Sequence, residues 1–249
     1  MTRTFAVLLG LCVLSLASCS ESPDAYQSSP VAAAQQPSDG IGVVILCDVS
    51  GSMSEDVSDG DGHQARKCAI ASAALQSVVE RLADFVACPS NRMKNISAEL
   101  LAFGDSSVTT VIPMRQFNRK AFLNAIRGLP SPSGGTPIGR AMEKATKDLF
   151  DSGLTRKHVI VITDGDNTAG PAQGKVLPQI QADASKMGTS VAFHFVAFDT
   201  DARDFDQVKK LGATVESASN GAQLKERLGY ILEYKILLEN EEPPPEKGR

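Results

Sequence analysis

The sequence predicts an α/β fold in which helices cover both faces of a mainly parallel, doubly wound β-sheet. Short apolar runs, typical of strands buried on both faces, alternate with longer segments whose apolar residues recur at the helical period. Such alternation is typical of a parallel sheet flanked by helices. Two of the apolar runs also end on an aspartate, Asp48 and Asp164. The carboxyl ends of parallel strands meet at one edge, so we expect these two acids to lie together, although they are 116 residues apart in the sequence.

The predicted elements follow one another from residue 43 to residue 235. Strands are expected at 43–47, 97–104, 108–114, 158–163, 190–198 and 214–218, and helices at 64–86, 119–129, 137–150, 173–187, 203–211 and 221–235. A short turn separates the second and third strands, which predicts an antiparallel hairpin. Pro137 suits the first position of a helix.

The amino terminus is predicted to lie outside the fold. Residues 1–18 hold one positive charge and an apolar run of about a dozen residues, which is too short for a membrane span and typical of a secretory signal. With the small residues before Cys19, the segment resembles the bacterial lipoprotein signal, in which such a cysteine is lipidated and becomes the first residue. The alternative is an ordinary signal peptide with an incidental cysteine.

The lipoprotein resemblance implies a lipid-anchored protein of the cell envelope. Ser20 directly after the cysteine implies no retention at the inner membrane, hence the outer membrane if the cell is Gram-negative. Residues 19–40 are rich in Ser, Pro, Gln and Ala and are predicted to form a flexible tether. The domain is expected at 41–236, followed by a charged, proline-broken tail at 237–249.

The charge of the chain argues against nucleic acid as a partner. The formal net charge is -4, and no basic stripe of the kind that binds phosphates stands out. The sequence leaves the oligomeric state open.

Three loops at the predicted sheet edge carry oxygen donors. They are Asp48-Val49-Ser50-Gly51-Ser52, Ser133-Gly134-Gly135-Thr136-Pro137 and Thr163-Asp164-Gly165. The set holds no His or Cys, which disfavours zinc, whereas carboxylates and hydroxyls suit a hard cation such as Mg2+ or Mn2+. An Asp or Glu from a partner could complete the coordination shell.

Asp48-x-Ser50-x-Ser52, followed by Thr136 and then Asp164, resembles the metal-ion-dependent adhesion site of von Willebrand factor type A domains. The resemblance covers about residues 40–236. It implies a six-stranded Rossmann-like sheet with one antiparallel edge strand. It also implies a role in binding proteins through a metal, without enzymatic activity, and assigns Thr136 as a ligand when the partner is bound.

Two other functions compete with metal-dependent protein binding. One is an accessory subunit that presents the domain to an envelope ATPase or secretion complex. The other is an Asp-nucleophile, Mg-dependent phosphohydrolase of the haloacid dehalogenase type, which the segment "VITDGDN" resembles faintly. Such an enzyme needs a second acid two residues after its nucleophile as general acid, and here Ser50 occupies that position.

The loop that follows the first serines is acidic. Glu55, Asp56, Asp59 and Asp61 could bind a second cation, such as calcium, or form a solvated flexible loop. With Asp166, Asp199 and Asp201 they are expected to surround the site with negative charge. The expected partner is therefore basic or neutral, with one exposed Asp or Glu.

Three cysteines remain in the predicted domain, Cys47, Cys68 and Cys88. Cys68 and Cys88 lie near opposite ends of one predicted helix, too far apart to bridge. Cys47 and Cys68 could form a disulfide. Otherwise all three are expected to be small buried residues.

Overall fold

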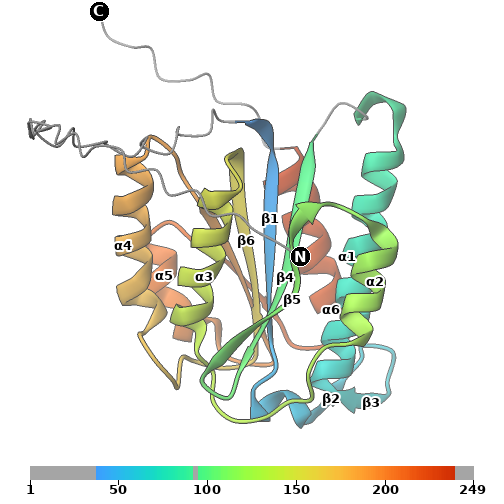
Figure 1. Cartoon of the computed structure of the whole chain (residues 1–249). Coiled ribbons are helices and arrows are strands. Elements are labelled where there is room, and N and C mark those ends of the chain that lie inside the picture. The colour runs from blue at the N-terminus through green and yellow to red at the C-terminus, as the bar shows by residue number, and fades with distance from the viewer. Residues whose placement is uncertain (1–37, 92–94, 239–249) are drawn as a thin grey trace, which may run out of the picture. The chain divides into compact units, whose positions relative to one another are not determined.

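Six strands form the central sheet, in the order β5-β4-β1-β6-β7-β8 (Figure 1). The computed structural model describes residues 38–91 and 95–238. The strands of the sheet are β1 (Ser38–Asp48), β4 (Ile96–Gly104), β5 (Ser107–Gln116), β6 (Leu154–Thr163), β7 (Ala192–Phe198) and β8 (Thr214–Ala218). The β4–β5 pairing is antiparallel and the others are parallel. The predicted sheet with one antiparallel edge strand is therefore confirmed.

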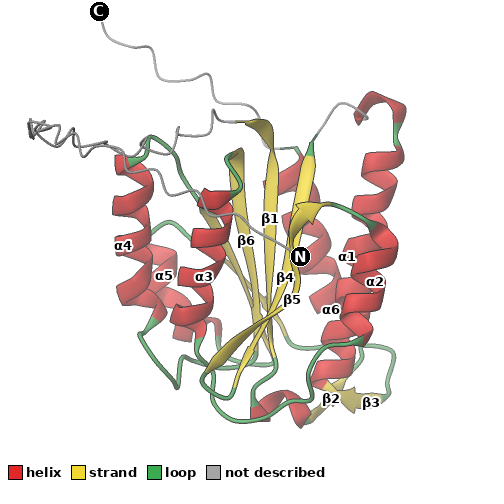
Figure 2. Cartoon of the chain, in the orientation of Figure 1, coloured by secondary structure: helices red, strands yellow, loops and turns green. Residues whose placement is uncertain are grey.

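Helices cover the sheet on both faces (Figures 1 and 2). One face carries α1 (Lys67–Ala87), α2 (Arg119–Arg127) and α6 (Gly221–Tyr230). The other carries α3 (Ile138–Asp151), α4 (Gln173–Lys186) and α5 (Asp206–Lys210). This arrangement confirms the doubly wound α/β class.

Strand β1 shows why the sheet needs both layers. Ile45 and Cys47 belong to the core under α1 and α6, whereas Val44 and Leu46 belong to the core under α3 and α4. Successive side chains of a strand point to opposite faces, so a run of apolar residues buries surface on both. Each such side chain contributes about 1.5–3 kcal/mol when fully buried.

Strand β1 begins at Ser38, five residues before the predicted start at Val43. The Ser38 amide donates to the Gly153 carbonyl at 2.9 Å, and the Gly40 amide donates to Thr155 Oγ1 at 3.2 Å. These hydrogen bonds extend β1 over residues 38–40, which show no apolar pattern. The predicted tether therefore overlaps the sheet at residues 38–40.

The predicted signal segment 1–18, Cys19, the tether up to residue 37 and tail residues 239–249 lie outside the described residues. Within residues 38–91 and 95–238, no helix combines the length and the hydrophobicity that a membrane-spanning helix needs.

The acidic loop after the first serines is ordered. β2 (Asp56–Ser58) pairs antiparallel with β3 (Gln64–Arg66), so the helix expected from residue 64 begins at Lys67. Asp59 Oδ1 closes the turn by accepting the amides of Asp61 at 2.7 Å and His63 at 3.1 Å. Across the described part of the chain, no three His, Cys, Asp or Glu side chains are grouped to hold a metal. The paired strands differ from the flexible loop that was one alternative, and a second cation in this loop stays a prediction.

The last two predicted helices are irregular. Segment 203–211 is divided between a 3-10 turn at Ala202–Phe205 and α5. Helix α6 continues into a π-helical segment at Ile231–Leu237. The hydrophobic period placed these segments correctly, but it does not distinguish the three kinds of helical hydrogen bonding.

The three cysteines are free thiols. Cys47 is buried, Cys68 is half-buried and Cys88 is exposed, so the possible disulfide is not formed and only one of the three is a core residue.

Candidate metal centre

Asp48 and Asp164 lie at the carboxyl edge of neighbouring strands. β1 and β6 run in parallel with Cys47 opposite Ile162, which brings Asp48 beside Thr163 and Asp164. The chain passes from β1 to β4 on one side and reaches β6 on the other, so the winding direction reverses here. Ligand sites of open α/β sheets occur at such a point, and the predicted proximity of the two acids is confirmed.

Hydrogen bonds join four of the five predicted site residues. Asp48 Oδ1 accepts from the Ser50 amide at 2.7 Å, and Asp48 Oδ2 accepts from Thr163 Oγ1 at 2.6 Å. The hydroxyls of Ser50 and Ser52 lie 3.2 Å apart. Ser52 Oγ then donates to Asp164 Oδ1 at 2.7 Å. The oxygens of residues far apart in the sequence thus form one connected group.

Thr136, the fifth residue, is buried at the same edge. The Gly51 amide donates to the Gly134 carbonyl at 3.0 Å, which joins the first loop to the second. The Thr136 amide donates to Thr168 Oγ1 at 2.8 Å, and the Thr168 amide returns a bond to the Thr136 carbonyl at 3.1 Å. Backbone contacts on both sides therefore hold the Thr136 loop in place.

Sequence reasoning missed Lys67, which lies in the centre of this edge. Its side chain is 5% exposed, and Nζ is 3.1 Å from each of Glu55 Oε2, Asp164 Oδ2 and Asp199 Oδ2. Burial alone would lower the pKa of Lys67, but its hydrogen bonds to the three carboxylates outweigh burial and raise the pKa. The side chain is therefore a fixed positive charge beside Asp164.

A signal for Lys67 was present in the sequence. Residues 70, 71 and 74 of α1 are buried, and Lys67 stands three, four and seven residues before them, on the same helical face. A charged residue in an apolar stripe needs buried partners of opposite charge.

The Asp48 carboxyl is wholly buried. Burial raises its pKa to about 6, and the nearby Asp164 adds to this, although the hydrogen bonds from Thr163 and Ser50 act in the opposite direction. A buried carboxylate is costly without a positive partner, and a cation bound here would lower the pKa again.

The donor set fits a hard divalent ion. Two carboxylates and the hydroxyls of three residues, Ser50, Ser52 and Thr136, are oxygen ligands of the kind that Mg2+ and Mn2+ prefer. Lys67 is shared among Glu55, Asp164 and Asp199, so it offsets only part of the negative charge of Asp164.

A cavity of about 390 Å³ adjoins Asp48 on the α1 side of the sheet. Its lining includes Arg66, Cys68 and Arg127. The space beside the candidate centre therefore carries positive as well as negative groups.

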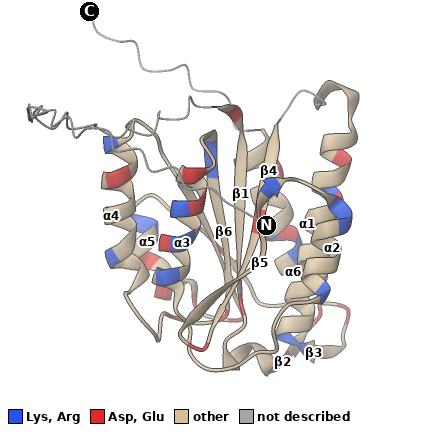
Figure 3. Ribbon diagram, viewed as in Figure 1, with Lys and Arg blue, Asp and Glu red and all other residues tan. Residues whose placement is uncertain are grey.

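Several acids of the predicted ring have hydrogen-bond or ion-pair partners. Asp199 binds Lys67, Asp201 binds Arg203, and Asp166 Oδ1 accepts from Gln173 Nε2 at 2.8 Å. In Figure 3, acidic segments appear in the loops at the lower end of the sheet, together with basic ones near β3. The edge is therefore mixed in charge rather than uniformly negative.

A doubly wound sheet with an Asp-x-Ser-x-Ser loop at its switch point defines a class of α/β domain. The sequence profile of the von Willebrand factor type A domain matches residues 43–167, and the chain belongs to this family. No curated protein sequence matches the chain.

Several solved structures share the fold. The PilB minor pilin from Streptococcus sanguinis is 16% identical with a TM-score of 0.59, over 78% of this chain and 60% of that one. The vWF domain of the type V pili tip protein Mfa5 from Porphyromonas gingivalis is 14% identical with a TM-score of 0.57, over 78% and 94%. Proximal thread matrix protein 1 from the mussel byssus, with a zinc-occupied MIDAS motif, is 17% identical with a TM-score of 0.53, over 79% and 48%. The chain spans about three fifths of the pilin.

Proposed function

We propose that this chain binds a protein partner through a divalent cation held by Asp48, Ser50, Ser52, Thr136 and Asp164. The carrying observation is the hydrogen-bonded group that runs from Asp48 through both serines to Asp164. Mg2+ or Mn2+ fits this oxygen-only set. The zinc in the mussel protein's motif supports a divalent ion at this position of the fold.

Each residue has a distinct task in this proposal. Asp48 and Asp164 provide the negative charge, and the three hydroxyls are neutral donors. Thr163 orients Asp48 through Oδ2, and Lys67 holds Asp164 through Oδ2. The Oδ1 atom of each acid accepts a hydrogen bond from Ser50 or Ser52. When bound, the ion would supply an open position for a carboxylate oxygen.

The partner in this proposal offers one exposed Asp or Glu. Arg66 and Arg127 in the adjoining cavity favour further negative groups near that carboxylate. Acids that form ion pairs, such as Asp199 and Asp201, repel a negatively charged partner less than unpaired acids do. The partner therefore need not be basic overall.

The chain is proposed to act in the cell envelope, anchored by a lipid on Cys19. Family likenesses to a minor pilin and a pilus tip protein are in keeping with an envelope location. Replacing Cys19 with serine should release the full-length protein from the membrane fraction. Retention of Cys19→Ser in that fraction would contradict lipid anchoring.

The arrangement around Asp48 supports the proposal of binding rather than hydrolysis. Both of its oxygens accept hydrogen bonds, and Ser50 stands where a phosphohydrolase needs a general acid. The role of accessory subunit to an envelope ATPase or secretion complex is one form of the proposed binding function.

Partner capture tests the proposal. Full-length protein and Thr136→Ala would be immobilised and exposed to envelope extract in Mg2+ and in EDTA. We expect specific capture only by the wild type in Mg2+. Thr109→Ala, at an exposed threonine of β5, is the matched control and should behave as the wild type. Equal capture in all conditions would exclude the metal edge as the binding site.

A further inference from the structure

Glu99 is a buried charged residue far from the metal edge. It lies in the middle of β4 and is 1% exposed. Leu101 and Phe103, on the same face of the strand, belong to the core under α3, so an apolar residue is expected at position 99. Glu99 stands four residues before Phe103, the partner of Asp48 across the sheet, which is roughly 13 Å along the strand.

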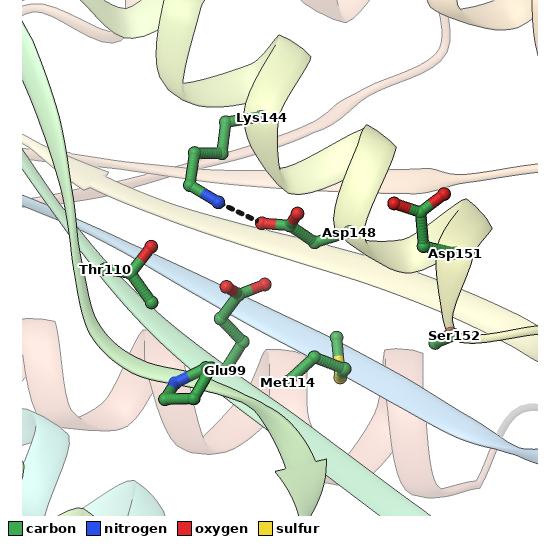
Figure 4. A pocket seen from close by; sticks show the side chains of 8 residues that line it. Glu99, Thr110, Met114, Lys144, Asp148, Asp151 and Ser152 are labelled. Carbon is green, nitrogen blue, oxygen red and sulfur yellow. Dashed lines mark hydrogen bonds and ion pairs between the residues drawn. The ribbon is translucent and has the colours of Figure 1, made fainter. Parts of the chain in front are cut away.

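A cavity of about 350 Å³ opens over this side chain. β5 contributes Thr110, Pro113 and Met114 to it, and α3 contributes Lys144, Asp148, Asp151 and Ser152. Figure 4 shows the Glu99 carboxyl group rising toward Lys144 and Asp148, with Thr110 and Met114 on either side. The volume lies at the small end of the range for ligand pockets.

The carboxyl group of Glu99 has unused capacity to accept hydrogen bonds. Its Oε2 atom is buried and has no hydrogen-bond partner among the described residues. Lys144, the nearest cation, is already committed, because its Nζ donates to Asp148 Oδ2 at 2.5 Å. Burial, followed by the charge of Asp148 and a hydrogen bond to it, raises the pKa of Glu99 to about 8. Buried polar atoms usually have a partner, so a missing donor is indicated here.

We propose that this pocket binds a cationic group, a guanidinium or ammonium, carried on a short aliphatic stem. Three carboxylates and a single lysine line it, so an anion would be repelled. Lys144 already occupies Asp148, and the apolar part of the lining suits an organic cation better than a bare metal ion. Met114 and Pro113 offer apolar surface to the stem.

Methyl NMR of the full-length protein tests this directly. The methyl group of Met114 lines the pocket, and its signal can be assigned among six methionines with Met114→Leu. The probes are n-butylguanidinium and n-butylammonium, with n-butylurea as the neutral shape control. We expect a saturable shift of the Met114 signal with both cations and none with n-butylurea.

Two substitutions should change this binding in opposite directions. Glu99→Gln keeps the shape but cannot ionise, so at pH 9, where Glu99 of the wild type is charged, affinity for n-butylguanidinium should fall at least tenfold. Lys144→Met removes the only cation of the pocket, so affinity should rise severalfold. Lys186→Met, at an exposed lysine of α4, is the matched control. If Glu99→Gln does not fold, Asp148→Asn should show the same loss.

The source of the cation is tested with a capped Gly-Arg-Gly peptide. A Met114 shift with the peptide would identify the ligand as a protein side chain, and a shift with n-butylguanidinium alone would identify a free small molecule. The proposal is overturned if neither cation shifts the signal, if n-butylurea shifts it equally, or if Glu99→Gln binds as well as the wild type.

Discussion

Lys67 occupies the first turn of α1, with its Nζ 3.1 Å from Asp164 Oδ2. The amino-terminal end of a helix carries partial positive charge, which disfavours lysine there. The carboxylates of Glu55 and Asp199 compensate, and they lie on segments that the fold brings together. The lysine is a tethered cation that holds the Asp164 carboxyl group in place when no metal is bound.

Replacing Lys67 with methionine tests this role. The change leaves Asp164 buried without a cation, which typically costs about 3–5 kcal/mol of unfolding free energy. A loss of about 3 kcal/mol corresponds to a fall in Tm of roughly 6–12 °C for a domain of this size. Mg2+ should restore more of the Tm in Lys67→Met than it adds to the wild type. An unchanged Tm, or an equal Mg2+ effect in both proteins, would argue against the role; Lys186→Met serves as control.

Glu99 makes stability depend on pH. Its pKa is raised from an ordinary 4.5 to about 8. The stabilisation that comes with the protonated form is therefore complete below pH 4.5 and is lost as the pH rises toward 8. Each pH unit in that window costs the wild type up to about 1.4 kcal/mol. Asp148 and Lys144 from α3 face this group, and Thr110 from β5 is uncharged.

The Tm of Glu99→Gln should therefore rise relative to the wild type between pH 5 and pH 9. The glutamine does not titrate, so it escapes the cost of ionisation beside Asp148. Glu143→Gln, at an exposed position of α3, is the control and should follow the wild type. A constant difference across this range would show that Glu99 does not titrate as inferred.

At the scale of elements, side-chain patterns predicted the interior of each strand better than its ends. The apolar run at 43–47 identified β1, but its first residues, from Ser38, are held by backbone hydrogen bonds to the segment before β6. The β2–β3 hairpin was missed for the same reason, since Asp56–Ser58 and Gln64–Arg66 carry little apolar surface.

Some residues of the candidate site could be predicted from the sequence and others could not. Asp48 and Asp164 could be predicted together because each ends an apolar strand of a parallel sheet. Lys67 stands in the apolar stripe of α1, which marks it as buried. The partners of Lys67 and Thr163 could not be assigned, because they lie on segments that only the folded chain brings together. Glu99 lies within an apolar strand, so the sequence pattern did not mark it as functional. Its proposed role depends on the residues of α3 and β5 that line the pocket around it.

Gly134 connects backbone geometry to the candidate centre. Its φ is +64°, and a Cβ there would collide with Asp105. Gly134→Ala should therefore move the loop that carries Thr136 and lower Mg2+ affinity at least tenfold. Gly188 has a similar φ of +66° with open space around it, so Gly188→Ala is the matched control. The left-handed backbone should cost each variant about 1–2 kcal/mol of stability, and Gly134→Ala should lose more because of its contact with Asp105.

The contrast that tests the centre lies in Mg2+ affinity, measured by calorimetry on folded protein. Equal Mg2+ affinity in Gly134→Ala and Gly188→Ala would mean that the loop position does not control the centre.

At the scale of the whole domain, the sheet brings together functional side chains from segments far apart in the sequence. β1 and β6 deliver the two acids, α1 delivers Lys67, and the segment before α3 delivers Thr136. Helix α3 then runs from that edge to the pocket over Glu99, so one element borders both proposed sites. Each site can be disabled without a substitution in the other.

The claim that this edge holds a divalent cation is central, and calorimetric titration of the full-length chain tests it most directly. Mg2+ and Mn2+ would be titrated into wild type, Asp48→Ala, Ser50→Ala and Ser52→Ala, with Tm recorded as a check on folding. We predict near one-to-one binding to the wild type, loss of binding in Asp48→Ala, and weaker binding in each serine variant. Absence of binding at millimolar ion, or equal affinity in Asp48→Ala, would contradict the account.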